Sequence, residues 1–250
     1  MGQVWIGCAG WTLPKECLVQ FPGPGTHLER YGRVLPAVEI NTTFYRPHRP
    51  ETFERWAASV PAGFRFSLKA PRAITHFRRL KDSEEILASF LEASAHLGDR
   101  RGPVVVQLPP TLRYEEGVGR GFFESLRRLH RGPIACEPRH PSWFAPDVES
   151  MLAGLEIARV AADPPRAEAD AQPGGWPGLA YFRLHGSPRM YFSAYDDDFL
   201  EALARRVRRL SRAGEVWVIF DNTATKAAAD NARSLMGRLA REDERRGEAP

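Results

Sequence analysis

The chain has 250 residues, of which 43% are hydrophobic and 26% charged, and it carries a net charge of +4 with a pI near 9.1. A chain of this size can bury the core of one large domain, and its mild positive charge permits anionic ligands without requiring nucleic acid. It has no run of eighteen apolar residues, which excludes a membrane-spanning helix, and we predict no signal peptide.

The cysteines, Cys8, Cys17 and Cys136, are odd in number and far apart in the sequence. This usage is typical of a reducing compartment and argues against a disulfide framework. We therefore expect a cytoplasmic protein.

Short apolar, β-rich segments recur along the chain and alternate with helical patterns. We predict strands over residues 4–9, 37–40, 64–68, 104–108, the start of 134–144, 157–161, 179–184 and 216–220. Helical patterns cover residues 26–33, 51–59, 82–97, 118–130, 144–155, 196–211 and 226–239. The helix over 82–97 is the clearest, because Asp82 and Glu85 form a capping-box pattern at its start and Gly98 follows its end.

The segment 163–178 differs from the other connections. It has four prolines, the pair Gly174–Gly175 and no periodicity, so we predict no full helix between the sixth and seventh strands. Residues 241–250 are charged and are expected to form a disordered tail. Without internal repeats or a linker, residues 1–240 are expected to form a single domain.

Strands that alternate with helices indicate parallel βα units, and eight such units in about 250 residues match the size of a TIM-type (β/α)8 barrel. The competing architecture is an open, doubly wound sheet. It would favour a GxGxxG turn after the first strand, and the sequence GCAGW there lacks that spacing.

Polar side chains gather where the predicted strands end, and in a barrel these positions meet at one mouth. The groups suited to proton transfer are Glu39, Glu137, His185 and Asp221. Groups suited to holding a substrate are Asn41, Lys69, Arg139, His140, Arg183 and Asn222. Aromatic side chains that could form a wall for a flat or sugar-like ligand are Trp11, Tyr45, Trp143 and Tyr191.

Structural roles compete with these functional ones. Glu39 alternates with apolar neighbours and faces the barrel interior, where it could form a buried pair with Lys69 or Arg183. Glu137 and Arg139 are two residues apart, on the same face of a strand, and could simply pair with each other. His140 precedes a proline and could only cap its loop.

Four of these side chains, Glu39, Glu137, His185 and Asp221, are also metal-ligand types. The positive charges of Lys69, Arg139 and Arg183 at the same mouth favour a phosphate or carboxylate and repel a divalent ion. We therefore predict no metal ligand and no cofactor, with a divalent metal as the alternative.

Seven segments together resemble the YecE-like family, domain of unknown function 72. They are GCAGW at 7–11, VEINTTFY at 38–45, FSLKAPRAITH at 66–76, VVVQLPP at 104–110, CEPRHPSWF at 136–144, YFRLHG at 181–186 and VIFDNT at 218–223. The resemblance implies a TIM barrel in the neighbourhood of xylose isomerase-like and endonuclease IV-like folds, in a family without an established activity. The chain departs from the family pattern at Cys8, where a hydroxyl is usual, at Pro138, and at Asp221, where an asparagine is usual.

These observations leave three functional hypotheses. The first is an enzyme, of the hydrolase, lyase or isomerase class, that binds an anionic or sugar-like small molecule at the mouth. The second is a metal-assisted phosphodiesterase or nucleic-acid-binding protein, which the fold neighbourhood and the arginines at 205–209 support, although a solvated helix face explains those arginines more simply. The third is a non-catalytic barrel that binds a ligand. The sequence does not specify an oligomeric state.

Overall fold

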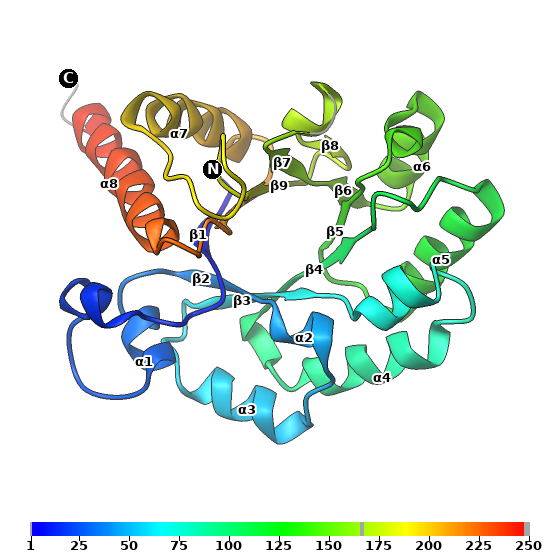
Figure 1. Ribbon diagram of the computed structural model, residues 1–250, viewed down its shortest axis with the longest axis horizontal. Helices are drawn as coiled ribbons and strands as arrows, with labels where there is room; N and C mark the ends of the chain where they lie inside the picture. Colours follow the sequence, from blue (N-terminus) through cyan, green and yellow to red (C-terminus); the bar gives the residue numbers. More distant parts are fainter. Residues whose placement is uncertain (1, 166–167, 248–250) are drawn as a thin grey trace.

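The computed structural model describes residues 2–165 and 168–247, and within them ten strands form one sheet that curves into a barrel (Figure 1). The strands are β1 (Val4–Ala9), β2 (Ala37–Ile40), β3 (Arg65–Lys69), β4 (Arg101–Gln107), β5 (Ile134–Glu137), β6 (Ile157–Arg159), β7 (Ala161–Asp163), β8 (Gly174–Gly175), β9 (Leu179–Leu184) and β10 (Glu215–Phe220). Their order is β7-β9-β10-β1-β2-β3-β4-β5-β6-β8, with parallel pairing except for β8. The predicted TIM-type barrel is confirmed.

The barrel closes at the predicted sixth strand, which the structure divides in two. β6 pairs with β5 and β7 pairs with β9, and only Val160 separates β6 from β7. The amide of Val160 still donates to the carbonyl of Cys136, at 2.8 Å. The segment therefore changes neighbours along its length and joins the two ends of the parallel sheet.

Helices surround this barrel (Figure 1). They are α1 (His27–Gly32), α2 (Thr42–Tyr45), α3 (Pro50–Ala58), α4 (Glu84–Ala95), α5 (Glu116–Leu129), α6 (Pro146–Gly154), α7 (Asp197–Ser211) and α8 (Ala227–Gly247). The shorter turns are η1 (Lys15–Gln20), the π-helix η2 (Ala73–Phe77), η3 (Gly98–Arg100), η4 (Pro141–Phe144) and η5 (Glu168–Ala171). In the described part of the connection from β7 to β9 only η5 is helical, as the prolines there predict.

Two predicted helix ends are wrong. α4 begins after Ser83, which makes no side-chain cap hydrogen bond, and Asp82 has a φ of 44°, so the expected capping box does not form. α8 continues to Gly247, eight residues beyond its predicted end, and takes up most of the expected tail. Residues 248–250 of that tail lie outside the described residues.

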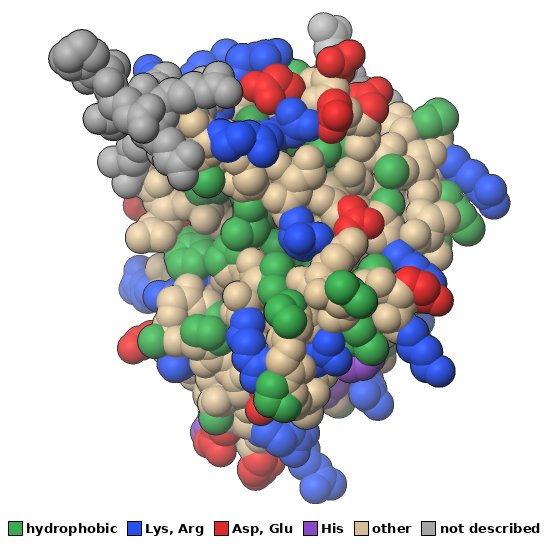
Figure 2. All heavy atoms as spheres, turned by 90° about the vertical axis from the view of Figure 1, so that its left-hand side faces the viewer, with side chains coloured by type: hydrophobic (Ala, Val, Ile, Leu, Met, Phe, Trp, Pro, Cys, Tyr) green, Lys and Arg blue, Asp and Glu red, His purple; other side chains and the backbone are tan. Residues whose placement is uncertain are grey.

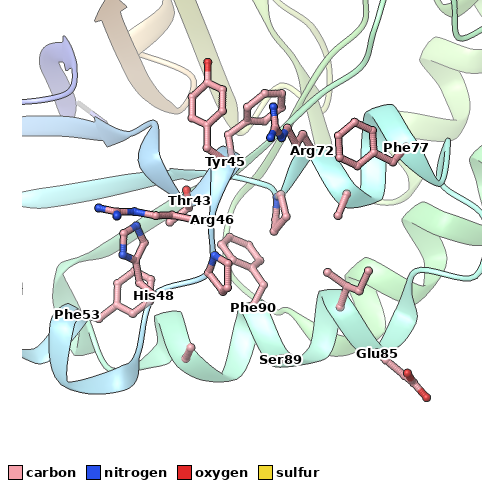
Figure 3. Close-up of a pocket in the computed structure, with 16 residues that line it drawn as sticks. Thr43, Tyr45, Arg46, His48, Phe53, Arg72, Phe77, Glu85, Ser89 and Phe90 are labelled. Atoms are coloured by element: carbon pink, nitrogen blue, oxygen red, sulfur yellow. The ribbon is translucent and has the colours of Figure 1, made fainter.

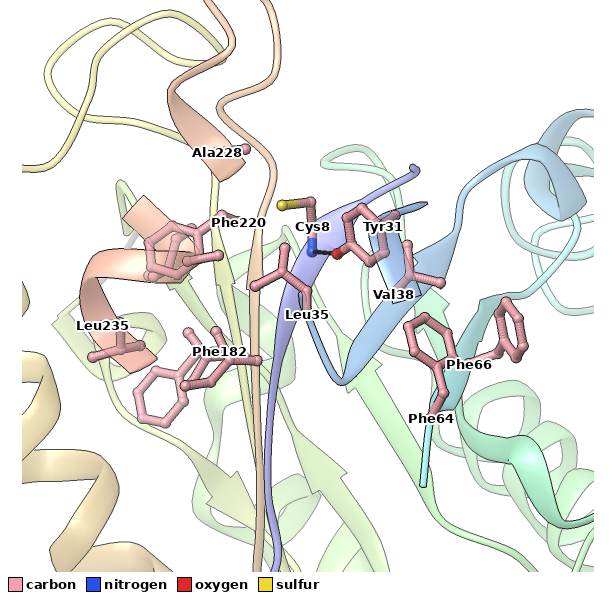
Figure 4. Close-up of a cluster of buried hydrophobic side chains, with 14 of the residues drawn as sticks. Cys8, Tyr31, Leu35, Val38, Phe64, Phe66, Phe182, Phe220, Ala228 and Leu235 are labelled. Atoms are coloured by element: carbon pink, nitrogen blue, oxygen red, sulfur yellow. Dashed lines mark hydrogen bonds between the residues drawn. The ribbon is translucent and has the colours of Figure 1, made fainter. Parts of the chain in front are cut away.

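The alternation along the strands sorts side chains into two layers. Val38 and Ile40 face outward and pack under the surrounding helices, whereas Glu39 between them faces the barrel interior. Figure 4 shows part of the outer layer, including the hydroxyl of Tyr31, which accepts from the amide of Cys8 at 2.8 Å. The cysteines are buried and free, as predicted.

The lower barrel interior is apolar. Aromatic and small side chains fill it, among them Trp5, Ala37, Tyr181 and Trp217. Because this apolar base excludes water, the charged groups above it are confined to the carboxyl ends of the strands, where they form the mouth. In residues 2–165 and 168–247, no helix has both the length and the apolar character needed to cross a bilayer.

Candidate active site at the barrel mouth

Arg183, on β9, lies at the centre of a charged cluster and is fully buried. Its Nε and Nη2 donate to Oε2 and Oε1 of Glu39 at 3.0 and 2.7 Å, which forms a bidentate pair. Its Nη1 donates to Oε2 of Glu137 at 2.7 Å, and Nη2 also lies 3.3 Å from Oδ2 of Asp221. One guanidinium thus holds three carboxylates that come from β2, β5 and the end of β10.

Glu137 has several further donors. Nε2 of Gln107 donates to its Oε2 at 2.9 Å, and Nη2 of Arg139 donates to its Oε1. Burial alone would raise the pKa of Glu137, but the charges of Arg139 and Arg183 outweigh burial and hold the pKa well below its usual range. Glu137 is therefore an ionised, fully buried carboxylate.

His185 connects Glu137, Arg139 and Asp221. Its Nδ1 lies 2.9 Å from Oδ2 of Asp221. Burial would raise the pKa of Asp221, but the hydrogen bond from His185 and the charge of Arg183 lower it, so Asp221 accepts and Nδ1 carries a proton. Nε2 lies 2.7 Å from Nη2 of Arg139 and 3.1 Å from Oε1 of Glu137. An Nε2 without a proton accepts from Nη2 of Arg139, and this arrangement fits the short contact between the two nitrogens.

Lys69, at the end of β3, is 7% exposed. Burial, reinforced by the charge of Arg183, lowers the pKa of its amine to about 8, although the nearby carboxylates oppose the shift. The ammonium lies 4.3 Å from the ring centroid of Phe44. Among the described residues it has no hydrogen bond or ion pair, unlike the other cations of the cluster.

The seven charged or titratable side chains at the mouth are referred to below as the mouth cluster: Glu39, Lys69, Glu137, Arg139, Arg183, His185 and Asp221. With His185 neutral, its three carboxylates balance its three cations. The positive charge that the sequence predicts for anion binding is thus mostly neutralised within the protein, and Arg183 is too deeply buried to contact a ligand directly in this structure.

Tyr181 and Ser67 belong to the site but were not predicted. The hydroxyl of Tyr181 donates to Oε2 of Glu39 at 3.0 Å and lies 2.7 Å from Oγ of Ser67. Each lies two residues before a predicted site residue, Arg183 or Lys69, and therefore faces the same interior. That two-residue spacing was the signal that could have identified them.

Two of the predicted aromatic wall residues lie away from the mouth. Trp143 is 1% exposed, packs in the outer core and donates from Nε1 to the carbonyl of Leu112 at 2.9 Å, so its predicted contact with substrate is wrong. Trp11 packs edge-on against Trp56 of α3, with ring centroids 5.1 Å apart.

Of the other two predicted wall residues, Tyr191 lies at the mouth and Tyr45 does not. Tyr45 is 62% exposed and lines a separate hollow outside the barrel. Tyr191, by contrast, lies edge-on to His185 with ring centroids 5.9 Å apart. Gly186, which directly follows His185, has a φ of 94°, and this backbone permits the sharp turn that brings Tyr191 back over the mouth.

The remaining predicted polar residues mainly support loops. His140 accepts from the amide of Ser142 and caps η4. This is the loop-capping role that the sequence analysis gives as the alternative to substrate binding. Asn222 is buried and donates from Nδ2 to the carbonyl of Ser193 at 3.0 Å. Asn41 directly precedes α2, and its Oδ1 is buried without a hydrogen-bond partner in the described part of the chain.

The acidic residues of the mouth cluster are not arranged as a metal site. Across residues 2–165 and 168–247, no group of three or more His, Cys, Asp or Glu side chains converges in a way that could hold a metal ion. The cause is local, because Arg139 and Arg183 lie between Glu39, Glu137 and Asp221.

Comparison with known proteins identifies similar sequences. A family model described as "Protein of unknown function DUF72" matches residues 5–250. The chain is 33% identical to UPF0759 protein YecE of Escherichia coli (strain K12) over 150 residues, which are 60% of this chain and 53% of that protein. The match therefore spans about half the length of that relative. UPF0759 protein YunF of Bacillus subtilis (strain 168) is 23% identical, with 94% of each chain covered.

Solved structures show the same fold. Crystal structures of DUF72 family proteins from Enterococcus faecalis and Thermotoga maritima match with TM-scores of 0.80 and 0.78. Their identities are 24% and 25%; the matches cover 95% of this chain in both cases, and 96% and 99% of theirs. A sugar phosphate isomerase/epimerase from Parabacteroides distasonis matches with a TM-score of 0.54 and 12% identity, over 96% of this chain and 95% of that one, which shows a shared fold alone.

Proposed function

Because the chain belongs to the DUF72 family of proteins of unknown function, we propose from its own geometry that it is an enzyme acting on a small anionic or sugar-like molecule. The substrate would bind at the barrel mouth through a phosphate or carboxylate. Its reaction would involve proton transfer, as in hydrolase, lyase or isomerase chemistry.

The observation that carries this proposal is the unpaired amine of Lys69. A buried cation is costly unless a partner neutralises it or a function requires it. The amine lies beside a network that is otherwise fully paired, and with its pKa near 8 it is largely protonated at pH 7. An anionic ligand would supply the missing partner.

The exposure of the cluster indicates which side chains a ligand would contact. Lys69, Arg139 and Asp221 are 7%, 7% and 9% exposed, whereas the groups beneath them are fully buried. Arg139 forms its hydrogen bonds through Nη2, which leaves Nε and Nη1 to donate to the same anion as Lys69. Two cations of different elements would thus hold one anionic group.

Asp221 and His185 are suited to the proton-transfer step. The bonds of Asp221 to Arg183 and His185 involve Oδ2, so Oδ1 is available to take a proton from a bound substrate. His185 would hold Asp221 in position for this step, because its Nδ1 donates to Oδ2. Glu39 and Arg183 would position these groups from below.

The first test is binding of inorganic phosphate, ribose 5-phosphate and glycerate, measured by thermal shift and titration calorimetry. Lys69→Met should weaken binding about tenfold or more, since a hydrogen bond to a charged group contributes about 1.5–3 kcal/mol. Lys81→Met is the matched control, because Lys81 is exposed and pairs with Glu115 at 3.7 Å on the surface. Equal binding by the wild type and Lys69→Met, or no binding of any anion, would contradict the proposal.

A second measurement separates an enzyme from a non-catalytic binding protein. Once a ligand is identified, Asp221→Asn should keep its affinity within a fewfold and abolish turnover or hydrogen exchange of the ligand with solvent. If the wild-type protein also shows no exchange and no turnover, the barrel binds without catalysis.

The nucleic-acid alternative has less support. On the face drawn in Figure 2, Lys and Arg side chains occur in small groups interrupted by acidic and uncharged ones. Within the arginines at 205–209, Arg206 donates to the carbonyl of Ala171 and Arg208 to that of Arg238, so both stabilise the fold. A phosphate backbone needs a continuous basic surface, which these residues do not supply.

A further inference from the structure

An open hollow of about 470 Å³ lies outside the barrel, between α2, α3, η2 and α4 (Figure 3). We refer to it as the outer groove. Its floor is apolar and includes Phe53 and Phe90, while Tyr45 and Phe77 stand at its edge with 62% and 68% of their surfaces exposed. Large aromatic side chains are rarely left this exposed at one place without a binding partner.

Two arginines are placed at the edge of the outer groove. Arg72 lies over the rings of both Tyr45 and Phe77, with its guanidinium carbon 5.4 and 5.3 Å from the two centroids. Arg46 follows Tyr45 and also lines the groove. Neither arginine side chain forms a hydrogen bond or ion pair with any described residue. Their donors are therefore free for an anion, and the two rings hold Arg72 in place.

The wall that carries Phe77 has an unusual backbone. η2 is a π-helix, and soon after it Arg79, Leu80 and Asp82 have φ values of 53°, 72° and 44°. Non-glycine residues in this region are uncommon, and π-helices are found frequently at functional sites. The hydrogen bond from Nη2 of Arg79 to the carbonyl of Thr111, at 2.8 Å, helps to hold this conformation.

We propose that the outer groove is a second ligand site, for a molecule with an apolar body and one terminal anion, either a carboxylate or a phosphate. The volume is that of a small-molecule site, and the apolar floor would take the body of the ligand. Arg72, which lies over the rings of Tyr45 and Phe77, would bind the anion, whereas Arg46 extends away from it on the side of His48 (Figure 3).

This site is distinct from the barrel mouth, although the two share a wall. Phe44 lines the outer groove, and its ring also contacts the amine of Lys69. The groove lining contains no residue of the mouth cluster. Variants of Lys69 and Arg72 therefore test the two proposed sites separately.

The test uses two fluorescent probes with the same apolar body. One is 8-anilinonaphthalene-1-sulfonate, which is anionic, and the other is N-phenyl-1-naphthylamine, which is neutral. We expect one molecule of the anionic probe to bind per chain. Arg72→Gln should weaken it about tenfold, the change produced by about 1.4 kcal/mol, and leave the neutral probe within twofold. Ser89→Trp, which fills the groove from α4, should weaken both probes.

Arg55→Gln is the matched control, because Arg55 is an exposed arginine on α3 outside the groove lining. Competition with decanoate, decyl phosphate and decanol then distinguishes a carboxylate from a phosphate ligand, and both anions from a neutral one. Lys69→Met should leave probe binding unchanged. The proposal is overturned if Arg72→Gln binds the anionic probe as the wild type does, if decanol competes as well as the anions, or if Ser89→Trp has no effect.

Discussion

The mouth cluster and the outer groove are neighbours that share Phe44, but they treat charge in opposite ways. Residues on or directly after five strands form the mouth cluster, whereas α2, α3, η2 and α4 line the outer groove. At the mouth, seven charged or titratable groups are packed over an apolar base and satisfy one another, with Lys69 as the exception. In the outer groove the surfaces are apolar and open, and the two arginines there are unpaired within the described chain.

In this protein the densest group of charged side chains and the most open cavity lie at different places. Charges at strand ends are brought together by the barrel itself, and because they pair they also close the space between them. The hollow forms where α2 and η2 project away from the barrel. Substitutions of the paired residues at the mouth should therefore lower the free energy of unfolding in a pH-dependent way, whereas substitutions in the groove should change binding alone.

Arg183→Met should have the largest effect. It leaves Glu39, Glu137 and Asp221 without their shared cation in a buried site, and removing one partner from a buried pair costs about 3–5 kcal/mol. Urea unfolding at pH 7 would measure this loss, with Arg55→Met as the surface control. A loss below about 1 kcal/mol would mean that the three carboxylates do not depend on Arg183. If the variant is too unstable to purify, Arg183→Lys should retain part of the stability.

Glu137→Gln should cost somewhat less, about 3 kcal/mol at pH 7, because the amide keeps some hydrogen bonds but leaves Arg139 and Arg183 under-neutralised. The folded-state pKa of Glu137 lies well below its usual value. Its stabilisation is therefore present above the usual carboxyl range near pH 4.5 and is lost as the pH falls through the lowered pKa.

The measurement for Glu137→Gln is urea unfolding from pH 7 to pH 3. The difference in the free energy of unfolding between the wild type and the variant should become smaller as the pH falls toward 3. Glu149→Gln is a useful comparison, since this carboxylate pairs with Arg159 at a more exposed site. A difference that stays constant with pH would show that Glu137 does not titrate as the structure indicates.

Strand periodicity predicted much of the mouth because it depends only on local geometry. Alternation on β2 and β9 directs Glu39 and Arg183 inward whatever the loops do, and parallel βα units place their strand ends together. The same rule applies to Tyr181, which faces inward two residues before Arg183. What the alternation could not give is the pairing, which depends on side chains from distant strands.

Loop residues were predicted less well, because no fixed period determines their direction. Trp143 follows the same strand as Glu137, but η4 turns it into the outer core. The left-handed backbone at Asp82 likewise overrides a good capping pattern, and the π-helix η2 has no sequence signal of its own. The outer groove was missed for this reason, although Tyr45 on its edge had been identified as a binding residue.

Among the three mouth variants, Lys69→Met should change the free energy of unfolding least, and it should raise that free energy instead of lowering it. Burial depresses the folded-state pKa of Lys69 from 10.5 to about 8, so the folded protein is penalised for the charged amine below pH 8. A shift of this size corresponds to a few kcal/mol, and with partial solvent access we expect a gain of about 2 kcal/mol at pH 7. The gain should fade between pH 8 and pH 10.5 as the wild-type amine loses its proton on folding. Arg72→Met in the outer groove should change stability by less than about 0.5 kcal/mol at either pH. A destabilised Lys69→Met would instead make the amine a structural partner of the carboxylates, and the mouth would then have no cation free for a ligand except Arg139.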